Sequence, residues 1–161
     1  MTAVPRLVAA GVLAFALGLA APAAPILAMG GGDSPQAKSE NDYDKAVKAV
    51  KAEKYKDAIE LLKKAVAKEP KKADAWNYLG YSQRKTGQFD DALKSYTAAL
   101  DIDPKHKGAH EYLGELYLMT DKLPKAEETL KKLQALCGGC DERKTLEKAV
   151  AAYKKAKGVT S

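Results

Sequence analysis

The two cysteines of this chain have the spacing of a redox-active pair, since they stand as Cys137-Gly-Gly-Cys140. Disulfide oxidoreductases use the C-x-x-C spacing at a helix N-terminus, beside a βαβ pattern. Cys140 does precede a predicted helix, but the chain shows no strand pattern. We therefore expect a structural disulfide, because the two glycines allow the tight closure that such a small loop requires. A redox-active dithiol and an unpaired state remain the alternatives.

The same cysteines could hold a haem group or a metal only with histidine partners. Covalent haem attachment needs C-x-x-C-H, and Asp141 occupies the histidine position. A zinc site needs two further ligands, for which His106 and His110 are the candidates, but their spacing matches no standard zinc module. We expect ordinary packing for His110, no metal site and no cofactor.

Catalytic motifs are absent from the sequence. The chain contains no G-x-S-x-G, no glycine-rich phosphate loop and no H-E-x-x-H. Carboxylates are abundant, yet they fall on predicted exposed helical faces rather than around one pocket. The sequence therefore favours a protein that is not an enzyme.

The first 28 residues have the layout of a secretory signal peptide. Arg6 provides the positive start, residues 7–21 are an unbroken run of apolar and small residues, and two prolines follow among alanines. Cleavage after Ala23 and cleavage after Ala28 both fit this layout. The alternative is an uncleaved inner-membrane anchor, since residues 7–28 are about long enough to span a bilayer.

An exported chain with a cysteine pair fits an oxidising compartment. The two asparagines, Asn41 and Asn77, both lack a hydroxyl residue two positions later, so the sequence offers no N-glycosylation site. Together with the alanine-rich leader, this makes the bacterial periplasm the expected location.

The chain is basic, with 27 lysines and arginines against 21 aspartates and glutamates and a formal net charge of +6. Many of the lysines lie between Lys45 and Lys72 among acidic residues, as on a solvated helical face. An anionic membrane surface or an acidic partner could use the excess positive charge. The sequence contains no base-reading module, so we expect no nucleic-acid partner.

Apolar residues recur at three- and four-residue spacings, which predicts amphipathic helices. The predicted helices are 40–52, 55–68, 73–86, 89–101, 107–120 and 124–136, with a seventh from about 142 to 157. Asp141 is the expected N-cap of the last helix. Pro124 fits the first turn of the sixth, where a missing N–H is harmless. Residues 29–38 are rich in glycine and polar residues, which predicts a flexible linker.

Equivalent residue types recur every 34 residues. One set of small residues comprises Ala46, Gly80 and Gly114, and a second comprises Ala58, Ala92 and Ala126. Pro70 and Pro104 end the first two units. Small residues at fixed positions let the two helices of a pair approach closely, and stacked pairs share a core that one pair could not bury alone.

The central unit, residues 73–106, resembles a tetratricopeptide repeat. The matching residues are Trp76, Leu79, Gly80, Ala92, Tyr96 and Pro104. They follow the W-x-x-L-G, A-x-x-x-F and proline pattern of that family, with tyrosine in place of phenylalanine. The resemblance implies an all-α fold, a right-handed α-solenoid. Its expected parts are three helix-turn-helix units at 39–72, 73–106 and 107–140, followed by a C-terminal capping helix at 141–157.

By this resemblance, the first helix of each pair lines a concave groove that binds extended or helical peptides. The implied groove residues are Tyr43, Val47, Asn77, Tyr78, Tyr81, Arg84, Lys85, Glu111, Tyr112, Glu115, Leu118 and Met119. Tyrosines suit peptide recognition, because each offers a large area and a hydrogen-bonding tip at a low entropic cost. The clamp with which part of the family grips C-terminal carboxylates is not implied, because other residues occupy its positions here.

The sequence therefore predicts a non-enzymatic adaptor or scaffold in the bacterial periplasm that binds a protein or peptide segment in this groove. An envelope complex is the expected setting, and association with a membrane surface is compatible with the charge. Two alternatives stay open. One is a thiol–disulfide protein that acts through Cys137 and Cys140, and the other is a homo-oligomeric scaffold that uses the groove on its own neighbours.

Overall fold

A computed structural model describes residues 41–159 of the chain. The predicted signal peptide (1–28) and linker (29–38) lie outside the described residues. Within residues 41–159 the chain forms seven helices and no strand, which confirms the predicted all-α repeat fold. The helices are α1 (Asp42–Lys51), α2 (Tyr55–Lys68), α3 (Ala73–Lys85), α4 (Phe89–Ile102), α5 (Lys107–Met119), α6 (Leu123–Leu136) and α7 (Asp141–Lys157). No helix in this region is both long and apolar enough to cross a bilayer.

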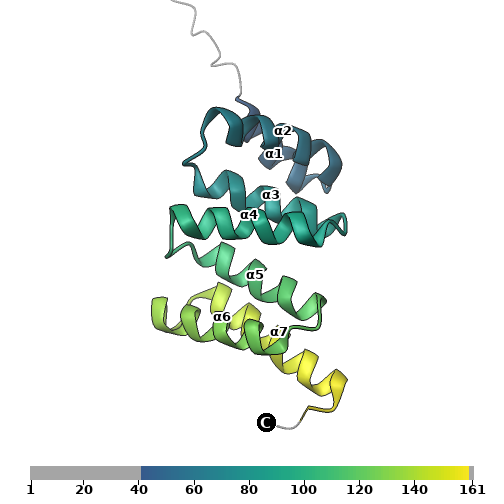
Figure 1. Cartoon of the computed structure of the whole chain (residues 1–161), viewed down its shortest axis with the longest axis vertical. Coiled ribbons are helices and arrows are strands. Elements are labelled where there is room, and N and C mark those ends of the chain that lie inside the picture. Colours follow the sequence, from purple (N-terminus) through teal and green to yellow (C-terminus); the bar gives the residue numbers. More distant parts are fainter. Residues whose placement is uncertain (1–40, 160–161) are drawn as a thin grey trace, which may run out of the picture. The chain divides into compact units, whose positions relative to one another are not determined.

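The helices form consecutive pairs that stack in chain order (Figure 1). α1 packs on α2, α3 on α4 and α5 on α6, and each pair contacts the next through α2–α3 and α4–α5. The first helices also approach one another closely, α1 with α3 and α3 with α5, whereas within the described chain the backbones of α2 and α4, and of α4 and α6, stay farther apart. The first helices therefore lie on the inner side of the stack. The last helix, α7, continues their row by packing against α5.

The tight turn inside each pair has one residue in the left-handed backbone conformation, at the same position of all three units. These residues are Glu53 (φ 57°), Gly87 (φ 80°) and Asp121 (φ 54°). Only glycine adopts this conformation without steric cost, so the packing of the joined helices holds the other two there. The Asp121 carboxylate also accepts a hydrogen bond from the Tyr153 hydroxyl at 2.7 Å, which ties the third turn to α7.

Two helix starts test the sequence predictions. Pro124 lies in the first turn of α6, as predicted. The prediction of Asp141 as the N-cap of α7 is wrong, because Cys140 holds that position with extended backbone (φ −67°, ψ 157°) and Asp141 is the first helical residue. A carboxylate in the first turn stabilises a helix through its dipole, so Asp141 favours the same helix from within it.

Glycines of the repeat register accept large side chains from neighbouring helices. A Cβ atom on Gly80 of α3 would lie 2.7 Å from the ring of Tyr96 in α4, and one on Gly114 of α5 would lie 2.5 Å from Leu146 in α7. Tyr96 and Leu146 are fully buried. Gly80 therefore sets the distance within its pair, as the register predicted, whereas Gly114 gives room to α7 and not to its pair partner α6.

Gly80→Ala should destabilise the protein. The added methyl group would have to displace the Tyr96 ring, which is fully buried and close-packed. We expect a loss of about 1–3 kcal/mol in the free energy of unfolding, measured by urea denaturation, in spite of the higher helix propensity of alanine. Gly139→Ala is the control, since nothing lies within 4 Å of its added Cβ. Equal losses in the two variants would contradict the spacing role of Gly80.

Candidate partner-binding groove

The sequence predicts that α1, α3 and α5 line the groove; in the structure α1 contacts α3 and α3 contacts α5 along the inner side of the stack. All twelve predicted groove residues belong to these three helices. Their degree of burial varies widely. Val47 is half-buried, Lys85 is exposed, and Met119 at the end of α5 is 51% exposed.

Tyrosine rings join the three helices across this face. Tyr43 of α1 meets Tyr78 of α3 edge to face, with ring centroids 6.1 Å apart, and Tyr81 of α3 meets Tyr112 of α5 at 5.0 Å. All four side chains are half-buried. Burial raises the pKa of Tyr43 and of Tyr112 to about 12. These two phenols are therefore neutral at physiological pH, and each can donate or accept a hydrogen bond.

Arg84 lies at the centre of the charged contacts in the groove. Its guanidinium group forms an ion pair of 2.8 Å with Glu115, and its side chain is only 10% exposed. The same group lies 5.4 and 5.6 Å from the ring centroids of Tyr81 and Tyr112, and its Nε donates to the Tyr96 hydroxyl at 3.4 Å. Ion pairing and cation–π contacts thus compensate its charge and hold it in one position.

Two residues that the sequence analysis did not include also reach the tyrosines. The Lys72 ammonium lies 4.3 Å from the ring centroid of Tyr43. Tyr55 packs on Tyr81 with ring centroids 5.9 Å apart, and Lys85 lies over both rings. Neither Lys72, the N-cap of α3, nor Tyr55, the first residue of α2, lies within a first helix. The groove residues were predicted only within the first helix of each pair, so that prediction could not include Lys72 and Tyr55.

Glu111 of α5 lies among other carboxylates. Its pKa is raised to about 7, mainly by burial and then by Glu115 and Glu142, against the opposing effect of Arg84. Arg84 is paired with Glu115 and not with Glu111. Glu142, from α7, was absent from the predicted groove. It stands 34 residues after Gly108, which is not a predicted groove position, so the repeat register could not have found it.

Two predicted groove residues, Asn77 and Leu118, are buried, which corrects the sequence analysis. Asn77 is 6% exposed and lies where α3 meets the start of α5. Gly108 has no side chain there, and a Cβ atom on it would lie 3.4 Å from the Asn77 Nδ2 atom. Leu118 is 8% exposed and packs in a core cluster with Leu146 and Val150 of α7. Both are covered by a helix that follows them in the chain.

Cys137 and Cys140 are paired through their sulfur atoms, with Cα atoms 5.6 Å apart. Cys137 is the C-cap of α6 and Cys140 is the N-cap of α7. The pair therefore joins the ends of two helices that pack on each other. Its assignment as a structural or a redox-active pair stays a prediction.

The two histidines make hydrogen bonds that stabilise helix starts. His106 is the N-cap of α5, where its Nδ1 accepts from the Ala109 N–H at 3.1 Å and its Nε2 donates to the Asp74 carboxylate at 3.1 Å. His110 is 6% exposed, and its Nε2 donates to the Pro104 carbonyl at 2.9 Å. Over residues 41–159, no three potential metal-ligating side chains gather at one place. The predicted packing role of His110 is confirmed.

Two family models described as tetratricopeptide repeat match the chain, at residues 43–106 and 83–136. Protein FlbA of Caulobacter vibrioides is 35% identical over 72 residues, and the anaphase-promoting complex subunit CDC16 of Saccharomyces cerevisiae is 35% identical over 91 residues. These alignments cover 45% and 56% of this chain, but only 12% and 11% of the two relatives. The chain thus matches a small part of each of these longer proteins.

Solved structures share the arrangement of helices. One is the type III secretion chaperone SycD of Yersinia enterocolitica in complex with a peptide of the translocator YopD. It has a TM-score of 0.64 at 24% identity, over 73% of this chain and 90% of that one. The two family models together span residues 43–136, more than half of the 161-residue sequence. With its stacked helical pairs and its repeat register, this chain belongs to the tetratricopeptide repeat family.

Proposed function

We propose that this protein is a non-enzymatic adaptor that holds a segment of a partner protein in the groove of α1, α3 and α5. The observation that carries the proposal is the set of four half-buried tyrosines whose rings join the three helices. Such rings offer contact area and hydrogen-bonding tips at a low entropic cost. SycD, which shares the arrangement of helices, was solved in complex with a peptide of the translocator YopD, and this supports a peptide segment as the partner.

The charges of the groove favour a partner segment that carries a basic residue. Arg84 is already paired with Glu115 and covered by tyrosine rings, so its charge is compensated. Glu111 lies half-buried near Glu115 and Glu142, where its negative charge is disfavoured. A lysine or arginine of the bound segment would remove this cost by pairing with Glu111.

The proposed setting is the bacterial periplasm, within an envelope or secretion complex. The support for this setting is the signal-peptide layout of residues 1–28 and the cysteine pair, which fits an oxidising compartment. An uncleaved leader would place the same groove at the inner-membrane surface.

Tyr78→Ala combined with Tyr112→Ala should lower partner capture at least tenfold in a quantitative pulldown from periplasmic extract. Each substitution removes ring area and a hydroxyl group from the groove. Circular dichroism checks that the helices persist. Lys94→Ala with Lys131→Ala is the matched control, because both lysines are exposed on second helices, α4 and α6.

If the double tyrosine variant captured the partner as well as the unsubstituted protein does, the proposed role of the groove would be contradicted. Capture of a second copy of this chain would identify a homo-oligomeric scaffold. Light scattering across a concentration series would then give the size of the assembly.

Glu111→Gln should stabilise the free protein in a pH-dependent way. The folded-state pKa of about 7 lies above the ordinary value of 4.5, so ionisation opposes folding. This cost is absent below about pH 4.5, grows as the pH rises, and is complete above about pH 7. We expect the variant to gain roughly 1–2 kcal/mol in the free energy of unfolding at pH 8, measured by urea denaturation, and to gain nothing at pH 4.5.

The control for this measurement is Glu128→Gln, because that exposed carboxylate is paired with Lys132 at 2.8 Å and its pKa is lowered. It should gain no stability at pH 8. A pH profile of Glu111→Gln that matches the unsubstituted protein would contradict the assigned environment of Glu111.

A thiol–disulfide function is the second candidate. The observation that favours it is the place of Cys140 at the N-cap of α7, because a helix N-terminus stabilises a thiolate. Thiol labelling of the protein across a series of redox buffers gives the reduction potential of the pair. We expect a value below about −300 mV, as for structural disulfides. A value between about −200 and −120 mV, the range of protein oxidants, would favour the second candidate instead.

A further inference from the structure

Glu111 of α5 is a groove residue whose charge has no counter-ion. Its side chain is half-buried, and within residues 41–159 its carboxylate forms no ion pair and no hydrogen bond. Arg84 lies close enough to act on it, but that guanidinium group pairs with Glu115 at 2.8 Å. The cation that could compensate Glu111 is therefore already engaged.

The charged groups that act on Glu111 come from three helices. Glu115 stands one turn later on α5, Glu142 comes from α7, and Arg84 comes from α3. Two like charges and an engaged cation make ionisation of a half-buried carboxyl group unfavourable. The pKa of Glu111 is accordingly raised to about 7, with burial as the largest cause.

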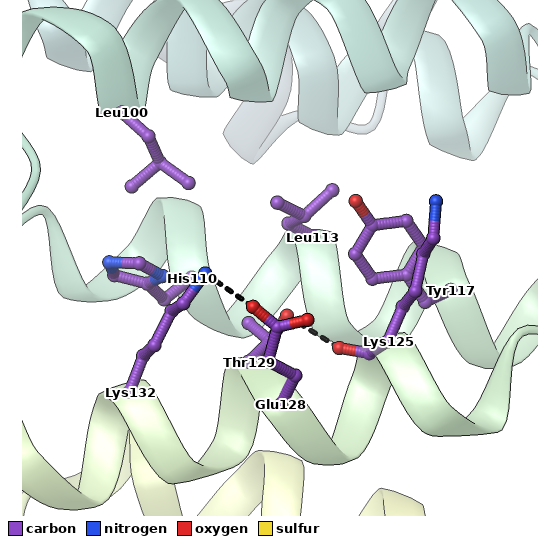
Figure 2. Close-up of a pocket in the computed structure, with 8 residues that line it drawn as sticks. All are labelled: Leu100, His110, Leu113, Tyr117, Lys125, Glu128, Thr129 and Lys132. Carbon is purple, nitrogen blue, oxygen red and sulfur yellow. Dashed lines mark hydrogen bonds and ion pairs between the residues drawn. The ribbon is translucent and has the colours of Figure 1, made fainter.

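Glu128 of α6 is a contrasting carboxylate in the same unit. It is exposed, and Figure 2 shows it directed toward Lys132, with which it forms an ion pair of 2.8 Å. The hydrogen bond from Lys132 lowers the pKa of Glu128. An ammonium group beside a glutamate thus holds the carboxylate ionised, and Glu111 lacks such a group.

This uncompensated carboxylate belongs to one end of the groove. The position of Glu111 in the third unit is held by Asn77 in the second and by Tyr43 in the first, at intervals of 34 residues. Both of these side chains are uncharged at neutral pH, since the pKa of Tyr43 is about 12. A cation of a bound segment that pairs with Glu111 therefore lies at the end formed by α5 and α7.

We propose that Glu111 makes capture of the partner segment depend on pH, because it pairs with a lysine or arginine of that segment only when it is ionised. This inference rests on the proposed function of the groove. A bound cation favours the ionised carboxylate, so binding of the segment releases the proton that Glu111 carries in the free protein. Capture therefore strengthens as the pH rises and weakens as it falls.

The size of the effect follows from the titration of one group. With a pKa of about 7, Glu111 is roughly nine-tenths ionised at pH 8 and roughly one-tenth ionised at pH 6. If only the ionised form pairs with the segment, the affinity falls about tenfold between these two values. It should change little above pH 8, where the proton has already left.

Two labelled peptides test this dependence on the whole exported protein. One carries a single arginine between leucine and tyrosine residues, and the other carries citrulline, which has the shape of arginine without its charge, at the same place. Fluorescence anisotropy gives the affinity of each at pH 6, 7 and 8. The arginine peptide should bind about tenfold more tightly at pH 8 than at pH 6. The citrulline peptide should bind more weakly than the arginine peptide at pH 8, with an affinity that does not change with pH.

Three variants assign the effect to Glu111. Glu111→Gln should bind the arginine peptide weakly and equally at all three pH values. Glu142→Gln, which removes one of the like charges, should move the midpoint of the pH dependence to a lower pH. Glu128→Gln is the matched control and should keep the behaviour of the unsubstituted protein, because that carboxylate is exposed on α6 and paired with Lys132.

Several results would overturn the inference. They are equal affinities of the arginine peptide at pH 6 and pH 8, the same pH dependence for citrulline or for Glu111→Gln, and no binding of the arginine peptide at pH 8. The groove itself is tested separately by partner capture with the Tyr78→Ala and Tyr112→Ala variant. If that variant loses capture while the arginine peptide shows no pH dependence, the groove function stands and the role of Glu111 falls.

Discussion

The close contact between Gly80 and Tyr96 connects the core of this protein to its groove. The glycine leaves room for the tyrosine ring between α3 and α4, and the ring is fully buried as a result. The hydroxyl of the same tyrosine accepts a hydrogen bond from Arg84. Arg84 in turn pairs with Glu115 of the next unit. A side chain that packs two helices together thus also orients the central cation of the candidate site.

The last helix, α7, covers the end of the repeat array and also contributes a side chain to the groove. It packs against α5 in the position that a further first helix would take. Leu146 fills the space at Gly114 and belongs to the core cluster in which Leu118 is buried. Glu142 adds a carboxylate near Glu111, which contributes to the raised pKa of that residue. The acidic character of this end of the groove therefore depends on α7 as well as on the third unit.

Trp76 and His110 occupy the same position of two repeats, where they make the same hydrogen bond but differ in size. In both units the ring nitrogen donates a hydrogen bond to the carbonyl of a proline in the preceding loop. The two rings differ in the volume that they occupy beyond that hydrogen bond. A repeat array can change its surface at such a position without losing the contact that holds its units together, because each unit contacts only its neighbours.

The amino-acid sequence by itself determined the helices, the 34-residue register and the family. Helix periodicity, turn residues and the recurrence of small residues are local properties, and the observed helix bounds agree with the predicted ones within two residues. Only the tertiary structure decided which groove positions face outward. Asn77 and Leu118 are buried by helices that follow them, and Glu111 owes its pKa partly to a residue of α7. Burial and electrostatic interactions depend on distances between separate helices, which a register along one chain does not contain.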